Sequence, residues 1–216
     1  MPNQYLFHKG TDRFNIKLHS MLRLFLFGLS LLLIQSVTAQ NDELGLRISY
    51  NTTENQSDIG MAGISLTGYY KFQTGEKFAI VPSFQYRKQR FRDNVLEIYQ
   101  NVDVKYFSIP VTVRYSPFNR KPLNDFYILS GLQADLVIDA KVEDKSTGER
   151  KNVHNLFNYA NGGYYYGLGY NIKRKIDVQI KWYQGLGNNY IEPTVSTTLE
   201  QNAFFEVSMA FILFTE

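Results

Sequence analysis

Three features of the sequence predict an all-β fold, namely an eight-stranded antiparallel up-and-down transmembrane β-barrel preceded by a signal peptide. The first feature is a short apolar run near the N-terminus. The second is the alternation of apolar and polar residues in eight later segments, which places the two kinds of side chain on opposite faces of a strand. The third is the alternation of long and short polar connections between those segments, which is typical of barrels that span an outer membrane.

The apolar run belongs to a predicted signal peptide. Its core, MLRLFLFGLSLLLIQSVTA (residues 21–39), has a basic residue at Arg23, continues as the apolar run 24–34 and ends in small residues at Ala39. This layout predicts export with cleavage after Ala39. A membrane-anchoring helix is the alternative, but the apolar run is well short of the about 20 residues that a spanning helix needs.

The whole leader covers residues 1–39, and the barrel domain is expected over residues 40–216. Residues 1–20 are polar and precede the signal-peptide core, which indicates that translation starts at Met21. The chain holds 23 basic and 20 acidic residues, and removal of the leader leaves 19 (23 − 4) and 19 (20 − 1). The mature protein is therefore electrically balanced, and binding to nucleic acid, which needs a clustered positive surface, is not expected.

The amino-acid composition further narrows the class of protein. The chain has no cysteine, so it holds neither disulfides nor a cysteine for N-terminal lipid attachment. No segment after the leader approaches the about 20 apolar residues of a spanning helix. Tyr and Phe contribute 16 residues each, and aromatic residues near strand ends suit the girdles of a membrane barrel.

The first four predicted strands are residues 43–50, 60–72, 77–91 and 103–116. The alternation is clearest in YFSIPVTVRY, residues 106–115, where every odd-numbered residue is apolar. Pro82 and Pro110 lie in two adjacent strands, and local bulges are expected there because proline cannot donate to the ladder. The apolar faces consist of Leu44, Leu46, Ile48 and Tyr50, then Ile64, Leu66, Tyr70 and Phe72, then Phe78, Ile80, Phe84 and Tyr86, and then Phe107, Ile109, Val111, Val113 and Tyr115.

The last four predicted strands are residues 125–139, 158–172, 175–187 and 203–214. In GGYYYGLG, Gly163, Gly167 and Gly169 alternate with tyrosines inside a strand, which favours space in a crowded lumen or barrel curvature over a phosphate-binding loop. The apolar faces consist of Phe126, Ile128, Leu132, Leu136 and Ile138, then Tyr164, Tyr166, Leu168 and Tyr170, then Ile176, Val178, Ile180 and Trp182, and then Phe205, Val207, Met209, Phe211 and Leu213.

The polar faces combine Ser, Thr, Gln and Gly with a few charges, a mixture that suits a narrow lumen. An eight-stranded barrel has an interior just wide enough for its own side chains, so a filled lumen is expected instead of a general diffusion pore. The charged residues predicted to face this lumen are Arg47, Lys71, Arg87, Arg114, Asp135, Asp177, Lys181 and Glu206.

The connections distinguish the membrane barrel from a soluble one. Those after the first, third, fifth and seventh strands are long: NTTENQSDI, RDNVLEIYQN, KVEDKSTGERKNVHNLF and NNYIEPTVSTTLEQN. Those after the second, fourth and sixth are shorter: QTGE, PFNRKPLN and KRK. Short periplasmic turns and long outer loops explain this rhythm, and both chain ends then lie on the periplasmic side. A soluble lipocalin-like ligand-binding barrel is the alternative, and it requires the apolar faces to point inward.

Several motifs resemble one known family. YFSIPVTVRYSPF, residues 106–118, resembles the Tyr-Leu-x-Ile-Pro-Leu-x-x-Lys-Tyr strand of small outer-membrane β-barrel proteins of Bacteroidota, the PorT-like family. FYILSGLQADLVI, with Gly131 at the usual glycine position, is similar to the next strand of that family, and FNYANGGYYYGLGYNI and IKWYQGLGNNY resemble the two that follow. FFEVSMAFILF resembles a terminal strand, and the resemblance implies that its aromatic end at Phe214 is read by the barrel-assembly machinery.

The residues that could act in metal binding or catalysis also have simple structural explanations. Asp135 and Asp139 are predicted to share a face, where paired carboxylates could bind Ca²⁺ or act as acid and base, although the spacing of a metal loop is missing. His154 is the only histidine after the leader, and no nucleophile motif surrounds it, although Asp144, Ser146 and Thr147 are near in sequence. We therefore expect no enzyme activity, no cofactor and no metal.

The sequence predicts a protein of the Gram-negative outer membrane, located there after cleavage near Ala39, with a structural or interaction role. Its expected partners are outer-membrane lipid, the barrel-assembly machinery and a protein bound through the outer loops. A component of a secretion or envelope-assembly machine is the alternative that the PorT-like resemblance implies, since the family's namesake belongs to the type IX secretion and gliding system. The apolar loop residues available to a partner are Tyr99, Phe157, Tyr190 and Ile191.

Overall fold

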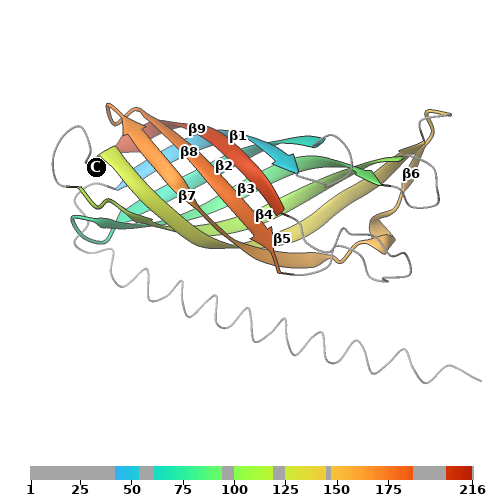
Figure 1. Cartoon of the computed structure of the whole chain (residues 1–216), viewed down its shortest axis with the longest axis horizontal. Coiled ribbons are helices and arrows are strands. Elements are labelled where there is room, and N and C mark those ends of the chain that lie inside the picture. The colour runs from blue at the N-terminus through green and yellow to red at the C-terminus, as the bar shows by residue number, and fades with distance from the viewer. Residues whose placement is uncertain are drawn as a thin grey trace, which may run out of the picture. The chain divides into compact units, whose positions relative to one another are not determined.

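The computed structural model describes residues 42–53, 61–93, 100–118, 125–144, 147–186 and 203–215. These residues form an antiparallel β-barrel (Figure 1), which closes because the first strand pairs with the last. The predicted leader, residues 1–39, lies outside the described residues. Within the described part of the chain, no helix is long and apolar enough to cross a bilayer.

Eight strands build the barrel wall, as predicted, and most of their ends lie within three residues of the predicted ones. The exception is the fifth, which runs to Asp144 instead of residue 139. A short strand, β6 (Arg150–Asn152), pairs with β5 beyond the barrel and is followed by the 3₁₀ helix η4 (His154–Leu156). The barrel strands are β1 (Glu43–Thr53), β2 (Met61–Gln73), β3 (Phe78–Asp93), β4 (Gln100–Tyr115), β5 (Phe126–Asp144), β7 (Ala160–Ile172), β8 (Ile176–Gly185) and β9 (Ala203–Thr215).

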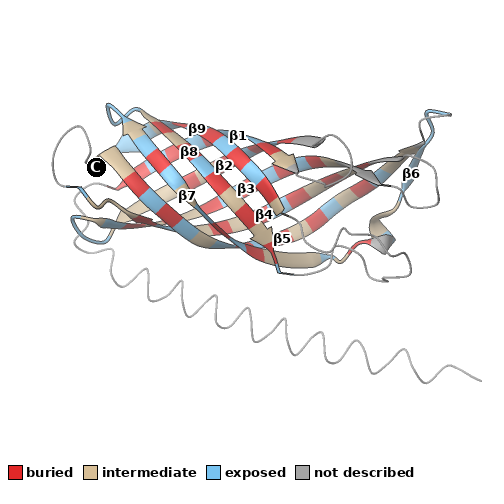
Figure 2. Cartoon of the chain, in the orientation of Figure 1, coloured by how far each residue is buried: buried red, intermediate tan, exposed pale blue. Residues whose placement is uncertain are grey.

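The apolar faces of the strands point outward and the polar faces point inward. Figure 2 shows the resulting alternation of exposed and buried residues along the strands. The large exposed hydrophobic side chains on the wall include Leu132, 66% exposed, and Phe107, 37% exposed. This is the reverse of what a soluble lipocalin-like barrel requires, and it is the arrangement of a wall that faces lipid.

The two prolines in the wall do not create bulges, contrary to the expectation from the sequence. In the β3–β4 ladder Pro82 faces Val111, and the register is the same before and after both prolines, although the pairs Ser83–Pro110 and Phe84–Ile109 are missing. In the β2–β3 ladder the register also continues past Pro82, and there the pairs Tyr70–Pro82 and Lys71–Val81 are missing. The ladder therefore tolerates each proline by a local loss of pairing. The register shifts lie elsewhere: between Leu44 and Gly45 in the β1–β9 ladder, and opposite Lys105 and Tyr106 in the β4–β5 ladder.

Three neighbouring strands are longer than the others. β3 and β4 have 16 residues and β5 has 19, whereas β1, β2, β7, β8 and β9 have 10 to 13. The extra length lies at the end of the barrel opposite the start of β1 and the end of β9, where β5 and β6 reach beyond the other strands (Figure 1). We call residues 88–93, 100–106 and 137–144, together with β6, the extension.

Candidate functional site

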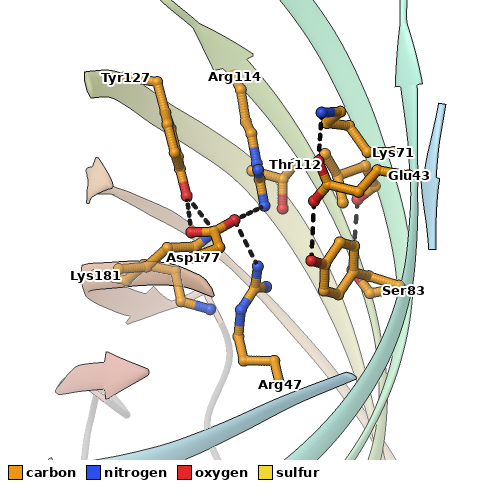
Figure 3. A network of polar contacts seen from close by, with 12 residues as sticks. Glu43, Arg47, Lys71, Ser83, Thr112, Arg114, Tyr127, Asp177 and Lys181 are labelled. Atoms are coloured by element: carbon orange, nitrogen blue, oxygen red, sulfur yellow. Dashed lines mark hydrogen bonds and ion pairs between the residues drawn. The ribbon is translucent and has the colours of Figure 1, made fainter. Parts of the chain in front are cut away.

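The inward-facing side chains of the barrel form ion-pair clusters, each around one carboxylate. The first centres on Asp177 of β8, which is completely buried. Arg114 Nη2 lies 2.8 Å and Arg47 Nη2 3.6 Å from Asp177 Oδ2, and the Tyr127 hydroxyl donates to Oδ1 (Figure 3). With the Gln179 amide turned so that its oxygen faces the donors around it, that oxygen accepts from the same two guanidinium groups, at 2.7 and 2.9 Å. One carboxylate thus serves two arginines on strands far apart in the sequence.

The second cluster centres on Asp135 of β5. Its carboxylate accepts hydrogen bonds from Tyr183 Oη at 2.7 Å and from the Ser108 hydroxyl, and it lies 3.4 Å from Arg87 Nη2. Arg87 is completely buried, and its guanidinium carbon lies 4.5 Å from the ring centre of Tyr106. Aromatic faces stabilise a desolvated cation, so this arginine is held by rings as much as by its carboxylate.

The third cluster pairs neighbouring strands. Lys181 Nζ of β8 lies 2.6 Å from Glu206 Oε1 of β9 and 5.2 Å from the ring centre of Tyr165. At the end of the barrel where β1 begins, Lys71 Nζ lies 2.5 Å from Glu43 Oε2 in a fourth ion pair (Figure 3). Buried charges are costly unless they are paired, and each cation in these four groups lies within 4 Å of a carboxylate. The Arg87 guanidinium makes this ion pair without a hydrogen bond.

Of the eight charges predicted to face the lumen, seven are buried, and Lys71 is half-buried and pairs with the buried Glu43. Aromatic residues fill the remaining space. Alternation had placed Tyr69 on the polar face of its strand, and the other aromatic residues were not predicted to be buried there. Each of these aromatic residues faces inward, is buried and lies next to a charged or polar side chain. They are Tyr69, Tyr106, Tyr127, Tyr165, Tyr183 and Phe204.

Glycines make room for these rings. Gly169 faces Tyr127 across the β5–β7 ladder, and Gly131 faces Tyr165 in the same ladder. A Cβ atom on either glycine would overlap the tyrosine ring. A Cβ atom on Gly163 would likewise overlap the Tyr183 ring. Gly163 and Gly169 therefore provide space for tyrosine rings in a crowded interior, as expected from the sequence. The sequence signal that could have revealed these inward tyrosines is a glycine at the inward position that faces each of them on the neighbouring strand.

In the extension the inner face is apolar, whereas in the barrel wall the inner face is polar. The inner face of the extension carries an apolar cluster, which includes Val104, Tyr106 and Val137. The cluster is covered by Phe157, which follows η4 and is 3% exposed. Phe157 was expected to be available to a partner in an outer loop, and that expectation is wrong because the long β5 strand needs a cover for its inner face. Tyr99, Tyr190 and Ile191 lie outside the described residues.

The outer face of the extension carries ion pairs. Arg90 binds Asp103 with two hydrogen bonds, of 2.5 Å from Nε and 3.0 Å from Nη2, and these hold the pKa of the Asp103 carboxyl below its usual range. Lys105 Nζ lies 3.0 Å from Asp139 Oδ2, and this hydrogen bond lowers the pKa of Asp139 in the same way. Both carboxylates are therefore ionised at neutral pH.

Asp135 and Asp139 do not share a face, which corrects the prediction from the sequence. Lys105 pairs with Asp139 and Tyr106 pairs with Val137, so Ile138 is an extra residue in β5. One extra residue reverses the side-chain parity of a strand, and Asp139 consequently lies on the outer face, away from Asp135. Among the described residues, no group of three potential metal ligands comes together.

Only two of the other candidate groups, His154 and Thr147, have described side chains. His154 Nε2 lies 3.2 Å from the main-chain oxygen of Val137, and Thr147 is exposed. Ser146 and the side chain of Asp144 lie outside the described part of the chain. Phe214, the proposed assembly signal, is 55% exposed on β9 opposite Leu44.

A comparison with protein families agrees with this architecture. A family model described as outer membrane protein beta-barrel domain matches residues 38–190. Among solved structures, the Yersinia pestis attachment invasion locus protein Ail is similar with a TM-score of 0.45 and 10% identity, over 82% of this chain and 100% of that one. Neisserial surface protein A gives 0.45 and 10%, over 79% and 96%. CarO of Acinetobacter baumannii gives 0.44 and 12%, over 79% and 97%. No curated protein matches.

Proposed function

Because the chain belongs to the outer membrane protein beta-barrel domain family, we propose that it is a non-enzymatic barrel with a filled lumen, whose role is structural or interactive. The observation that carries this proposal is the packing of the interior. Charged side chains from opposite sides of the wall meet at Asp177 and Asp135, and buried rings occupy the space between them. Such an interior leaves the outer surface and the loop end for contacts with other molecules.

Conductance in planar bilayers tests the filled lumen. We expect the purified protein to leave the bilayer current at its baseline, because each buried cation lies against a carboxylate. Reproducible single-channel steps in the native protein, lost in Arg114→Ala but retained in Arg174→Ala, would contradict the proposal. Arg174 lies in the exposed β7–β8 turn and is a matched control for the loss of one arginine.

Site-specific photo-crosslinking tests the interaction role. A crosslinker at Glu149, exposed in the β5–β7 connection, is expected to capture a discrete species in native envelopes. The same crosslinker at Lys173, exposed in the β7–β8 turn, serves as the control for the opposite end. Identical products from the two positions would contradict a specific contact at the loop end and would favour a purely structural role.

Assembly through the C-terminal strand is part of the proposal. Phe214 is exposed next to the seam between β1 and β9, where it is accessible to the barrel-assembly machinery. Phe214→Ala should reduce the amount of heat-modifiable barrel in native cells, and Thr215→Ala should not. The expected signal peptide and its cleavage near Ala39 can be checked by N-terminal sequencing of the same material.

A component of a secretion or envelope-assembly machine remains the second candidate. Its support is the resemblance of residues 106–118 to the PorT-like strand of Bacteroidota barrels. Deletion of the gene should then impair protein secretion or gliding. Normal secretion and gliding in the deletion strain would remove this candidate and leave the general proposal intact.

A further inference from the structure

The outer surface of the barrel changes abruptly from apolar to cationic on β3 and β4. From Phe78 to Tyr86 the outward side chains of β3 are uncharged, and the next outward residue is Lys88. On β4 the outward residues from Tyr115 to Phe107 are likewise uncharged, and the next is Lys105. The two changes coincide, because the register pairs Tyr86 with Phe107 and Lys88 with Lys105.

Lys88 is incompletely paired. Its Nζ lies 3.9 Å from Asp103 Oδ2, at the limit of an ion pair, and its side chain is 46% exposed. Asp103 already binds Arg90 through two hydrogen bonds. One carboxylate therefore faces two cations.

Lys105 shares its partner too. Asp139 Oδ2 lies 3.0 Å from Lys105 Nζ and 3.3 Å from Lys141 Nζ. Around Lys88 and Lys105, the described residues thus place four cations against two carboxylates: Lys88 and Arg90 share Asp103, and Lys105 and Lys141 share Asp139. Glu143, farther along β5, is paired with Arg150. Like charges directly opposite each other in an antiparallel ladder are destabilising, so the facing Lys88 and Lys105 leave a place for a further anion.

The height of Lys88 and Lys105 on the barrel wall indicates which kind of anion can reach them. At about 3.3 Å per residue and a tilt of about 40°, the outward residues from Phe78 to Tyr86 cover roughly 20 Å of height. An outer-membrane apolar band is about 25 Å tall, so Lys88 and Lys105 lie where hydrocarbon gives way to headgroups. On the opposite side Lys88 pairs with Ile64, whose side chain is 64% exposed and lies in the apolar band.

We propose that Lys88 and Lys105 bind a phosphate group of a phosphorylated lipid in the leaflet next to the loop end of the barrel. Two ammonium groups on adjacent strands can contact two oxygens of one phosphate, and the acyl chains of the same lipid can lie along Ile64 and Phe107. The partner is a lipid because the site is continuous with the apolar band; a dissolved phosphate would gain nothing from that surface. This inference rests on the proposed outer-membrane barrel.

The test compares lipid retention in nanodiscs of phosphatidylcholine that contain a small fraction of diphosphorylated lipid A. Native mass spectrometry should find lipid A bound to the native protein and reduced about thirtyfold in affinity in the double variant Lys88→Gln/Lys105→Gln, since each lysine near an anionic lipid surface contributes about fivefold. The control double variant Lys173→Gln/Lys175→Gln removes the same charge from the opposite end and should bind as the native protein does. Lys88→Arg/Lys105→Arg should retain binding.

The outcomes separate the two proposals. An unheated gel band that shifts on boiling establishes the folded barrel independently of lipid binding. Equal retention of lipid A by the native protein and by the Lys88→Gln/Lys105→Gln variant would overturn the phosphate site while the barrel stands. Retention of dephosphorylated lipid A to the same extent, or full displacement by inorganic phosphate, would likewise overturn it. Absence of the shifting band would instead count against the proposed outer-membrane barrel.

Discussion

The spanning wall and the extension are made from the same strands, yet their apolar faces point in opposite directions. In β4 the outward residues Ile109 and Val113 are apolar where the strand belongs to the wall, and the inward Arg114 is buried in the lumen. Beyond Tyr106 the inward Val104 is apolar and the outward Lys105 is charged. The strand continues without interruption through this reversal.

The difference shows that alternation and environment are separate pieces of information. The period of two follows from backbone geometry and is the same in both regions. Which face is apolar depends on what each face meets: lipid outside and charged partners inside the wall, but water outside and a protein cover inside the extension. The point of reversal therefore marks the end of the hydrocarbon layer, and it can be read from one strand.

The largest expected effect tests the interior of the wall. Asp177→Ala leaves Arg47 and Arg114 without the carboxylate that they share, and removal of one partner from a buried ion pair costs about 3–5 kcal/mol. The free energy of unfolding in urea, followed by the heat-modifiable band, should fall by that amount. Asp139→Ala, its counterpart on the outer face of the extension, should cost less than about 1 kcal/mol because its ion pair with Lys105 is partly exposed to solvent.

A second prediction tests the cover of the extension. Phe157→Ala removes a buried ring from the cluster on the inner face of β4 and β5, and such truncations cost about 3–5 kcal/mol in a fully enclosed core. We expect the loss to appear as local opening. Amide exchange should accelerate in residues 100–106 and remain slow in residues 107–115. Equal acceleration in both segments would show that the wall and the extension open as one unit.

A third prediction tests the fit between glycine and tyrosine in the wall. Gly169→Ala places a methyl group against the Tyr127 ring, and overpacking of this kind costs about 1–3 kcal/mol. Gly68→Ala is the control, because the nearest atom to a Cβ there is Leu46 Cδ2 at 3.9 Å. Similar urea midpoints for the two variants would contradict the proposed packing role of Gly169.

The smallest effect concerns the surface charges of the extension. Hydrogen bonds from Arg90 hold the pKa of Asp103 below its usual range. The stabilisation is therefore present above the unfolded pKa of about 3.9, and it is lost as pH falls through the lower folded value. Carbon-13 NMR should place the Asp103 midpoint below about 3.9. Arg90→Gln should raise that midpoint, and Lys173→Gln at the opposite end should leave it unchanged.

Much of the wall could be predicted from the sequence because lipid and lumen impose opposite requirements on alternate residues. The eight strands, their outward faces and the inward position of charges such as Arg87 and Asp177 follow from that single pattern. The inward tyrosines were harder to identify. Tyr127 is adjacent in sequence to apolar Phe126 and Ile128, so hydrophobicity alone does not reveal which of the three faces the lumen.

The extension was less predictable because its structure depends on distant contacts. The extra residue Ile138 leaves no distinct signal in LVIDAK, yet it moves Asp139 to the opposite face from Asp135. The burial of Phe157 depends on how the β5–β7 connection folds back on β4. Neither feature follows from local periodicity.

The shared carboxylate at Asp177 has a consequence for assembly kinetics. Arg47 lies on the first barrel strand and Asp177 on the one before last, so they meet only when β1 and β9 join. An open sheet would hold these charges apart, and contacts between residues so distant in sequence form late. The interior ion pairs thus stabilise the barrel only once β1 and β9 have joined. They make closure a cooperative last step after all the strands are in place.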